Sequence, residues 1–190
     1  ILGKNISIVG AVTQLGKNKI NKRQWDSEFI DKNDFFCPDP NVIEDWKRYL
    51  TEIRKDGSSC GALIEIVVKG VPAGLGEPVY GKLDAELASA LMSINAVKGI
   101  EIGAGFQSVG MTGEKNSDEI KVDEEGKIEF LSNNAGGILG GISSGQDIIC
   151  KLAVKPTSSI LKYQRTITTD NKNTTIRTKG RHDPCVGIRC

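Results

Sequence analysis

The chain has 190 residues, enough for one large domain or two small ones with a substantial buried core. Its 25 Lys and Arg residues nearly balance 24 Asp and Glu residues, so it lacks the excess positive charge with which nucleic-acid-binding proteins displace counterions from phosphates. No apolar run approaches the roughly 18 residues that span a bilayer, and we expect neither a nucleic-acid nor a membrane partner. Glycine is the unusual component, since eleven of the 22 glycines fall between Gly99 and Gly145.

The first third of the chain predicts a strand and a helix. β-Branched residues predict a strand over 6–15, and a polar, irregular segment follows. Asp39 can cap a helix whose first residue is Pro40, and Gly57 can end it. Ile43, Trp46, Leu50 and Ile53 recur at helical spacing, which makes Trp46 a core anchor, and Glu44 and Arg48 have the spacing of an ion pair.

The rest of the chain alternates strands, one further helix and two hairpins. In chain order, we expect a strand at 62–68, a helix at 83–94, a strand at 98–102, a hairpin of 120–122 with 127–130, a strand at 147–154, and a hairpin of 166–169 with 174–178. Hairpins and separated helices, without a regular βαβ alternation, indicate an α+β fold with antiparallel sheets.

The common nucleotide and hydrolase motifs are missing or incomplete. Gly103 and Gly105 follow a predicted strand, but Ser108 replaces the third glycine of a dinucleotide fingerprint and no helical pattern follows. The sequence contains neither a phosphate-binding P-loop motif nor the G-x-S-x-G motif of hydrolases. His182 is the only histidine, and the five cysteines form no C-x-x-C pair, which argues against a zinc site or disulfide framework and favours buried thiols in a reducing cytosol.

Three segments combine residue types suited to binding an anion or a flat ligand. The glycine pairs of 133–146 either let backbone approach a ligand or form a tight turn packed on small neighbours. Lys155, three hydroxyls and Pro156 within 155–159 suit a phosphate group, or form an ordinary polar turn. Arg181 and Asp183 flank His182 and place a cation near a carboxylate. Asp183 can also cap a following helix.

Together these segments resemble chorismate synthase, in the order that family has them. The resemblance rests on residues 35–40, 70–78, 92–99, 133–146, 155–159 and 180–189. It implies a layered β-α-β sandwich of antiparallel sheets with helices packed between them, formed by a single partial domain over 1–190 with a polar, helical excursion around 16–57. It also implies a cytoplasmic lyase of the shikimate pathway, which converts 5-enolpyruvylshikimate 3-phosphate to chorismate and phosphate by a 1,4-anti elimination.

The resemblance also implies a cofactor and its contacts. The family requires reduced FMN, and some members carry a flavin reductase activity associated with NADP, which the residues of this chain leave open. Asp183 matches an acidic position proposed to assist proton transfer. The positions that match flavin contacts are Asn95, Ala96, Gly140, Lys155, Pro156, Thr157, Ser158, Ser159 and Arg181.

The resemblance covers about half of a complete family member. The family's N-terminal Ser-His-Gly-type motif and much of its phosphate-binding arginine cluster lie upstream of the segment matched here. We therefore expect residues 1–190 alone to be inactive and the protein to assemble as a homotetramer. The alternative is a non-catalytic structural or oligomerisation fragment, in which the glycine loops only permit close packing.

Overall fold

The computed structural model describes residues 5–180 and 183–189. Its strands are β1 (Ser7–Leu15), β2 (Asn18–Lys19), β3 (Ala62–Lys69), β4 (Val97–Ile102), β5 (Ile120–Val122), β6 (Ile128–Phe130), β7 (Ile138–Leu139), β8 (Ile142–Ser143), β9 (Ile148–Val154), β10 (Gln164–Ile167) and β11 (Asn173–Ile176). Its α-helices are α1 (Ile43–Lys55), α2 (Leu83–Met92) and α3 (Gly113–Asn116). Five short 3-10 helices are η1 (Lys22–Gln24), η2 (Ile30–Lys32), η3 (Pro40–Val42), η4 (Gly105–Gly110) and η5 (Val186–Ile188).

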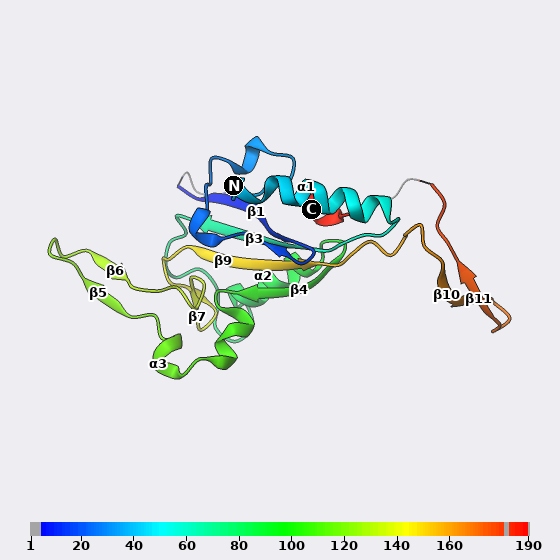
Figure 1. The fold of residues 1–190 in the computed structure, drawn as a ribbon. Helices are drawn as coiled ribbons and strands as arrows, with labels where there is room; N and C mark the ends of the chain where they lie inside the picture. Colours follow the sequence, from blue (N-terminus) through cyan, green and yellow to red (C-terminus); the bar gives the residue numbers. More distant parts are fainter. Residues whose placement is uncertain (1–4, 181–182, 190) are drawn as a thin grey trace. The chain divides into compact units, whose positions relative to one another are not determined.

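The central element is a five-stranded sheet with the strand order β2-β1-β3-β9-β4 (Figure 1). Three antiparallel two-stranded sheets accompany it, namely β5-β6, β7-β8 and β10-β11. The expected α+β class with antiparallel sheets and few helices is thereby confirmed. Residues 1–11 and 64–153 form one compact unit, and residues 12–63 and 154–190 form a second. Along the chain, β1, β3 and β9 each cross a boundary between the units, and each unit is described separately below.

The second unit is built on a core around α1. Trp46 has no exposed surface, and its ring meets Phe35 edge to face, with centroids 5.9 Å apart. The predicted capping by Asp39 is present, since buried Asp39 accepts a hydrogen bond from Asn41 N at 3.0 Å and precedes Pro40. It caps the 3-10 turn η3, however, and α1 itself begins only at Ile43, so the predicted first residue of the helix was wrong. Gly57 follows the helix with a positive φ of 66°. The predicted core role of Trp46 is also confirmed.

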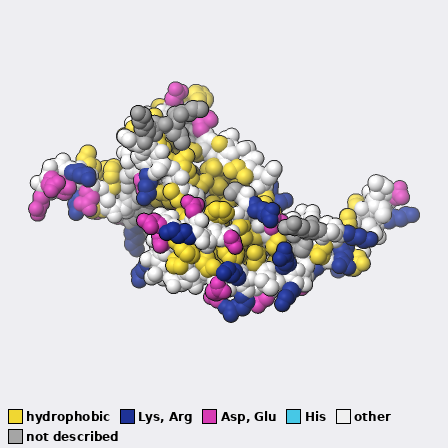
Figure 2. All heavy atoms as spheres, turned by 90° about the horizontal axis from the view of Figure 1, so that it is seen from above, with side chains coloured by type: hydrophobic (Ala, Val, Ile, Leu, Met, Phe, Trp, Pro, Cys, Tyr) yellow, Lys and Arg dark blue, Asp and Glu magenta, His cyan; other side chains and the backbone are white. Residues whose placement is uncertain are grey.

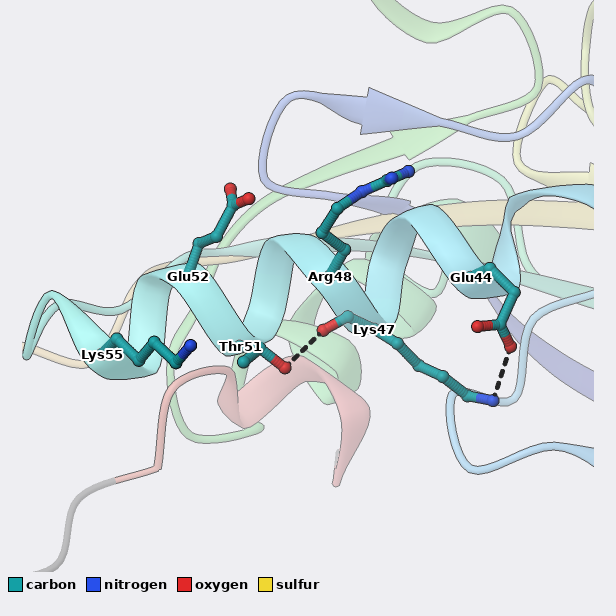
Figure 3. A pocket seen from close by; sticks show the side chains of 6 residues that line it. All are labelled: Glu44, Lys47, Arg48, Thr51, Glu52 and Lys55. Atoms are coloured by element: carbon teal, nitrogen blue, oxygen red, sulfur yellow. Dashed lines mark hydrogen bonds and ion pairs between the residues drawn. The ribbon is translucent and has the colours of Figure 1, made fainter.

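The ion pairs of α1 differ from the prediction. Lys47 Nζ pairs with Glu44 at 2.8 Å, as Figure 3 shows, and Arg48 pairs with Asp45. The predicted pair of Glu44 with Arg48 was therefore wrong. Positions three and four apart share one helix face, so sequence spacing alone does not choose between the two pairings. The acidic groups lie in the first turn, where the helix dipole favours them.

The first unit has its core under α2. Val71, Ile138, Ile148 and Cys150 form a buried cluster. The partly buried residues that pack against it include Leu83, Leu87 and Leu91 of α2, which recur at helical spacing as the sequence predicted. The opposite side of this helix is exposed at Met92. The helix ends at Met92, two residues before the predicted end.

Both predicted hairpins are present, one in each unit. In the first unit, Lys121 pairs with Glu129 across β5-β6, and Asp123 fixes the turn by accepting hydrogen bonds from the N–H groups of Glu125 and Lys127. In the second unit, β10-β11 is shifted from the expected bounds, because Asn173 pairs with Ile167 inside the ladder. Figure 2 shows mixed charges on the β5-β6 hairpin and mainly basic side chains on β10-β11.

Candidate functional site

The predicted phosphate-binding segment 155–159 is an ordered loop directly after β9. Ser59 Oγ donates a hydrogen bond to Thr157 O at 2.6 Å. Gly61 lies against the same loop so closely that a Cβ there would stand 2.5 Å from Val154 O and 3.3 Å from Pro156 Cδ. The loop is therefore fixed by backbone and hydroxyl contacts rather than by the charge of Lys155.

The loop 155–159 presents polar groups that are not all hydrogen-bonded to other described residues. Thr157 Oγ1 is buried, and no hydrogen-bond partner for it is found within 5–180 and 183–189. Lys155, Ser158 and Ser159 are exposed. A buried hydroxyl without a partner costs free energy, so a bound acceptor would stabilise it. One free hydroxyl, two exposed hydroxyls and an ammonium match the hydrogen-bonding needs of a phosphate group.

Asp183 lies in a second segment of the same unit. Its Oδ2 accepts a hydrogen bond from Arg189 Nε at 2.8 Å, and its Oδ1 accepts a long one of 3.4 Å from Cys185 N. The expected role of Asp183 as a helix cap is wrong for the described residues, because residues 183–189 form only the 3-10 turn η5, whose N-cap is Cys185. The predicted cofactor-binding residue Arg181 lies outside the described residues.

A cavity of about 500 Å³ in this unit is lined by Asp183. Its other walls come from the segment after Asp183 and from one side of α1, and they combine apolar and charged side chains. They comprise Asp34, Phe35, Lys47, Leu50, Thr51, Arg54, Pro184, Cys185, Ile188 and Arg189. Asp183 therefore faces a space large enough for a small ligand. A second hollow of about 450 Å³ lies along the exposed, charged face of α1 shown in Figure 3.

Residues Ser59, Cys60 and Gly61 hold both segments, and the sequence did not reveal this role. Ser59 and Gly61 contact the loop 155–159, whereas Cys60 N donates a hydrogen bond to Pro184 O at 2.8 Å. The backbone N–H of Cys60 thus serves the segment after Asp183, while its two neighbours serve the loop 155–159. The available signal was the run of small residues from Gly57 to Gly61 between a predicted helix and a predicted strand.

In the first unit, Gly140 is the exposed tip of the β7-β8 hairpin. Gly140 and Gly141 have φ values of 59° and 83° and connect strands paired at Leu139 and Ile142, the geometry of a type I′ turn. A Cβ on Gly140 would meet nothing within 4 Å, so this glycine leaves open surface for a ligand. Gly141 serves packing instead, because a Cβ there would collide with Lys82 at 2.5 Å.

Asn95 and Ala96 lie at the other end of α2 from Gly140. Gly141 O accepts a hydrogen bond from Leu83 N, the first residue of α2, whereas Asn95 and Ala96 follow its last residue. Ten helical residues separate the two places by about 15 Å, so a single small group does not contact both. Asn95 is exposed, and Ala96 has the unusual φ of 70° for a residue with a side chain.

The remaining glycines of 133–146 mainly serve packing. A Cβ on Gly136 would stand 2.4 Å from Gly103 N, so these two backbones touch. Asp118 holds the adjoining turn by accepting hydrogen bonds from Ser132 Oγ and the N–H groups of Asn134 and Ala135, at 2.6 to 2.8 Å. Burial raises the pKa of Asp118, but these hydrogen bonds outweigh it and lower the pKa overall. The packing interpretation of the glycine segment is therefore confirmed for Gly136 and Gly141, and the approach of a ligand at Gly140 stays a prediction.

Metal-ligand clusters and membrane-spanning helices are both absent from the part of the chain that the structure describes. Within residues 5–180 and 183–189, no three His, Cys, Asp or Glu side chains gather as metal ligands. Among the same residues, no helix has the length and apolar character needed to cross a bilayer.

The arrangement so far defines an α+β protein with antiparallel sheets, a free hydroxyl in a lysine-bearing loop, and a carboxylate facing a cavity. A sequence model of the chorismate synthase family matches residues 1–190. The chain belongs to this family.

Two chorismate synthases illustrate the similarity of sequence. The protein from Agrobacterium fabrum is 56% identical over 185 residues, which are 97% of this chain and 51% of the relative. The protein from Pelagibacter ubique is 60% identical over 188 residues, which are 99% of this chain and 52% of the relative. The chain thus spans about half the length of these curated relatives.

The fold agrees with a solved structure. A chain described as a crystal structure of chorismate synthase superposes with a TM-score of 0.74 at 31% identity, over 81% of this chain and 50% of that chain. The resemblance drawn from the sequence motifs is therefore confirmed at the level of family and fold.

Proposed function

We propose that the protein containing this chain converts 5-enolpyruvylshikimate 3-phosphate to chorismate and phosphate, a lyase step of the shikimate pathway. The observation that carries the proposal is the match of the family over residues 1–190. The reaction is a 1,4-anti elimination in which a phosphate leaves one end of an allylic system and a proton leaves the other. A protein serves such a step by holding the substrate, stabilising the departing charge and excluding water.

The residues of this chain fit a reduced FMN cofactor. When bound, reduced FMN supplies electron density to the electron-poor system that phosphate departure creates. Lys155 offers an exposed ammonium to an anionic group, and Thr157 Oγ1 offers a buried hydroxyl with no partner among the described residues. Gly140 offers open backbone to a flat ring. We propose Lys155 and Thr157 as cofactor contacts of the second unit. The family resemblance adds Gly140, Asn95 and Ala96 of the first unit to the proposed contacts.

The loop around Lys155 contributes its neighbours as well. Pro156 restricts the backbone beside Gly61, which lowers the entropy lost when the loop closes on a ligand. Ser158 and Ser159 are exposed hydroxyls that can donate to phosphate oxygens, and we propose both as contacts. The proposal extends to Arg181 on sequence grounds alone.

Asp183 is the proposed group for proton transfer. Its carboxylate faces the cavity of about 500 Å³, and its Oδ2 is held by Arg189 Nε at 2.8 Å. This contact orients the carboxylate and leaves Oδ1 with only a long hydrogen bond of 3.4 Å. Oδ1 is therefore the atom at which a proton would be held or passed.

Binding of FMN tests the cofactor proposal with a readout besides turnover. In the full-length protein, Lys155→Ala should raise the dissociation constant of FMN about 10-fold, the effect of losing one charge-assisted hydrogen bond. The matched control is Lys172→Ala, an exposed lysine in the β10-β11 turn, which should leave binding unchanged. Equal affinities of the two variants would contradict the role of Lys155, and absence of FMN binding by the unmodified protein would favour a structural fragment.

Turnover tests the length needed for activity. We infer that residues 1–190 alone form no chorismate when supplied with reduced FMN and 5-enolpyruvylshikimate 3-phosphate, because the chain spans about half of its relatives. A full-length protein assayed beside it serves as the positive control. Comparable turnover by the two would refute the inference.

The assembly and location are proposals of the same origin. We propose a cytoplasmic homotetramer, in line with the family resemblance, with the small-molecule substrate as its partner. Light scattering of the full-length protein after gel filtration measures the assembly, and a mass of one or two chains would contradict it.

A further inference from the structure

Two cysteines that are far apart in sequence lie side by side in the second unit. Cys60 is 5% exposed and Cys185 is 1% exposed. Cys60 N donates a hydrogen bond of 2.8 Å to Pro184 O, an atom of the peptide unit that joins Pro184 to Cys185. This hydrogen bond brings the two cysteines close together, and a disulfide requires a Cα separation of about 4.4–6.8 Å. The two thiols also lie close enough to shift each other's pKa.

The segment that carries Cys185 is held against the start of β3. Gly187 packs on Ala62 so closely that a Cβ on Gly187 would stand 2.5 Å from Ala62 Cβ. Asp183 and Arg189 clamp the two ends of the segment to each other through their ion pair. The surrounding backbone therefore holds the two segments that carry the thiols beside each other.

Each thiol affects the pKa of the other through their contact. The contact with Cys60, with smaller contributions from nearby backbone N–H groups, lowers the pKa of Cys185 in spite of burial. The same contact, together with burial, raises the pKa of Cys60. Tyr49 lies nearby, and burial followed by the two thiols raises the pKa of its phenol. Cys185 lines the cavity of about 500 Å³, which provides a route for a small oxidant.

We propose that Cys60 and Cys185 form a redox modification site, at which a peroxide converts the two thiols into a reversible disulfide. The Cys185 thiolate attacks one oxygen of the peroxide, and the O–O bond breaks. Cys185 becomes a sulfenic acid, and the other oxygen departs as water after taking up the proton that the Cys185 thiol had released. The Cys60 thiol then attacks this sulfur, and the S–O bond breaks. The hydroxyl takes the proton of the Cys60 thiol and leaves as a second water. Two thiols and hydrogen peroxide thus give one disulfide and two waters, with the sulfurs oxidised and the peroxide reduced.

Cys150 provides the matched comparison within the chain. It is 2% exposed, and burial raises the pKa of its thiol to about 11. A thiol of that kind stays protonated near neutral pH and reacts slowly with peroxide. The proposal therefore distinguishes Cys185 from a cysteine of equal burial.

Peptide mapping of the full-length protein tests the proposal independently of activity. The reduced protein is treated with hydrogen peroxide, its remaining thiols are alkylated, and trypsin is applied without reductant. Each target thiol falls in its own tryptic peptide, 56–69 for Cys60 and 182–189 for Cys185, and Cys190 falls outside both. The expected product is these two peptides joined, with a mass two hydrogens below their sum, which dithiothreitol separates again. Recovery of both peptides unlinked, or of Cys185 linked to another cysteine, overturns the proposal.

Variants and thermal unfolding sharpen the test. Cys60→Ser and Cys185→Ser should each abolish the linked product, whereas Cys150→Ser should retain it. A disulfide closing a loop of roughly 125 residues should raise the unfolding midpoint by about 10 °C, and reduction should remove the rise. An unchanged midpoint in the linked protein would refute the inference that the bond joins two segments already in place.

Discussion

Replacing Gly61 with alanine isolates the contact on which the loop 155–159 rests. The new methyl group would stand 2.5 Å from Val154 O, a backbone atom that cannot rotate away. An ordinary carbon–oxygen contact is roughly 0.8 Å longer, so the end of β9 and the loop must move by about that amount. Overpacking of this kind costs about 1–3 kcal/mol. The movement carries Thr157 away from Ser59 Oγ, and we expect FMN binding to weaken together with stability.

Urea unfolding and FMN titration of Gly61→Ala measure the two effects. Gly10→Ala is the matched control, since Gly10 lies in β1, has no positive φ and has nothing within 4 Å of the added carbon. It should change the free energy of unfolding by less than about 1 kcal/mol. Equal stability of the two variants would refute the close contact at Gly61. A Gly61→Ala variant that is destabilised but binds FMN with unchanged affinity would show that the loop 155–159 does not contribute to cofactor binding.

The remaining predictions concern single side chains. Asp118→Asn should cost about 1–2 kcal/mol, because three donors then face a neutral amide. Since the pKa of Asp118 is lowered in the folded state, its contribution is present above the unfolded value of about 3.9 and is lost as the pH falls through the folded value. Acid titration of stability should therefore show a smaller loss in the variant than in the unmodified protein, and parallel curves would contradict this. Trp46→Ala should cost about 3–5 kcal/mol by denaturant unfolding, and Trp46→Phe clearly less, because Trp46 Nε1 has no hydrogen-bond partner within the described residues to lose. Equal costs of the two Trp46 variants would show that the indole is held by more than packing.

Local patterns predicted the elements because the relevant forces act over a few residues. Asp39 next to Pro40 marked the 3-10 turn that leads into α1, and the spacing of the apolar residues placed Trp46 in the core. The pairing of Arg48 with Asp45 was missed, because two acidic residues were within its reach.

The candidate site was predicted only in part for a different reason. The loop at Lys155 was recognisable from its own residues, but its contact with Ser59 joins positions 98 apart in the sequence. Nothing local to Ser59 indicates which distant backbone it meets. The assignments of Asn95, Ala96, Gly140 and Asp183 rest on the family resemblance and stay predictions.

The contacts of Ser59, Cys60 and Gly61 also bear on the order of folding. Their partners at Thr157 and Pro184 follow about a hundred residues or more later, so the chain must close long loops before these contacts form. Loops of that length are closed late, after local helices and hairpins. During synthesis on the ribosome, α1 can form early, whereas the hydrogen bonds of Ser59 to Thr157 and of Cys60 to Pro184 must wait until these distant partners emerge. We therefore expect this stretch to be the last part of the unit to gain protection from hydrogen exchange.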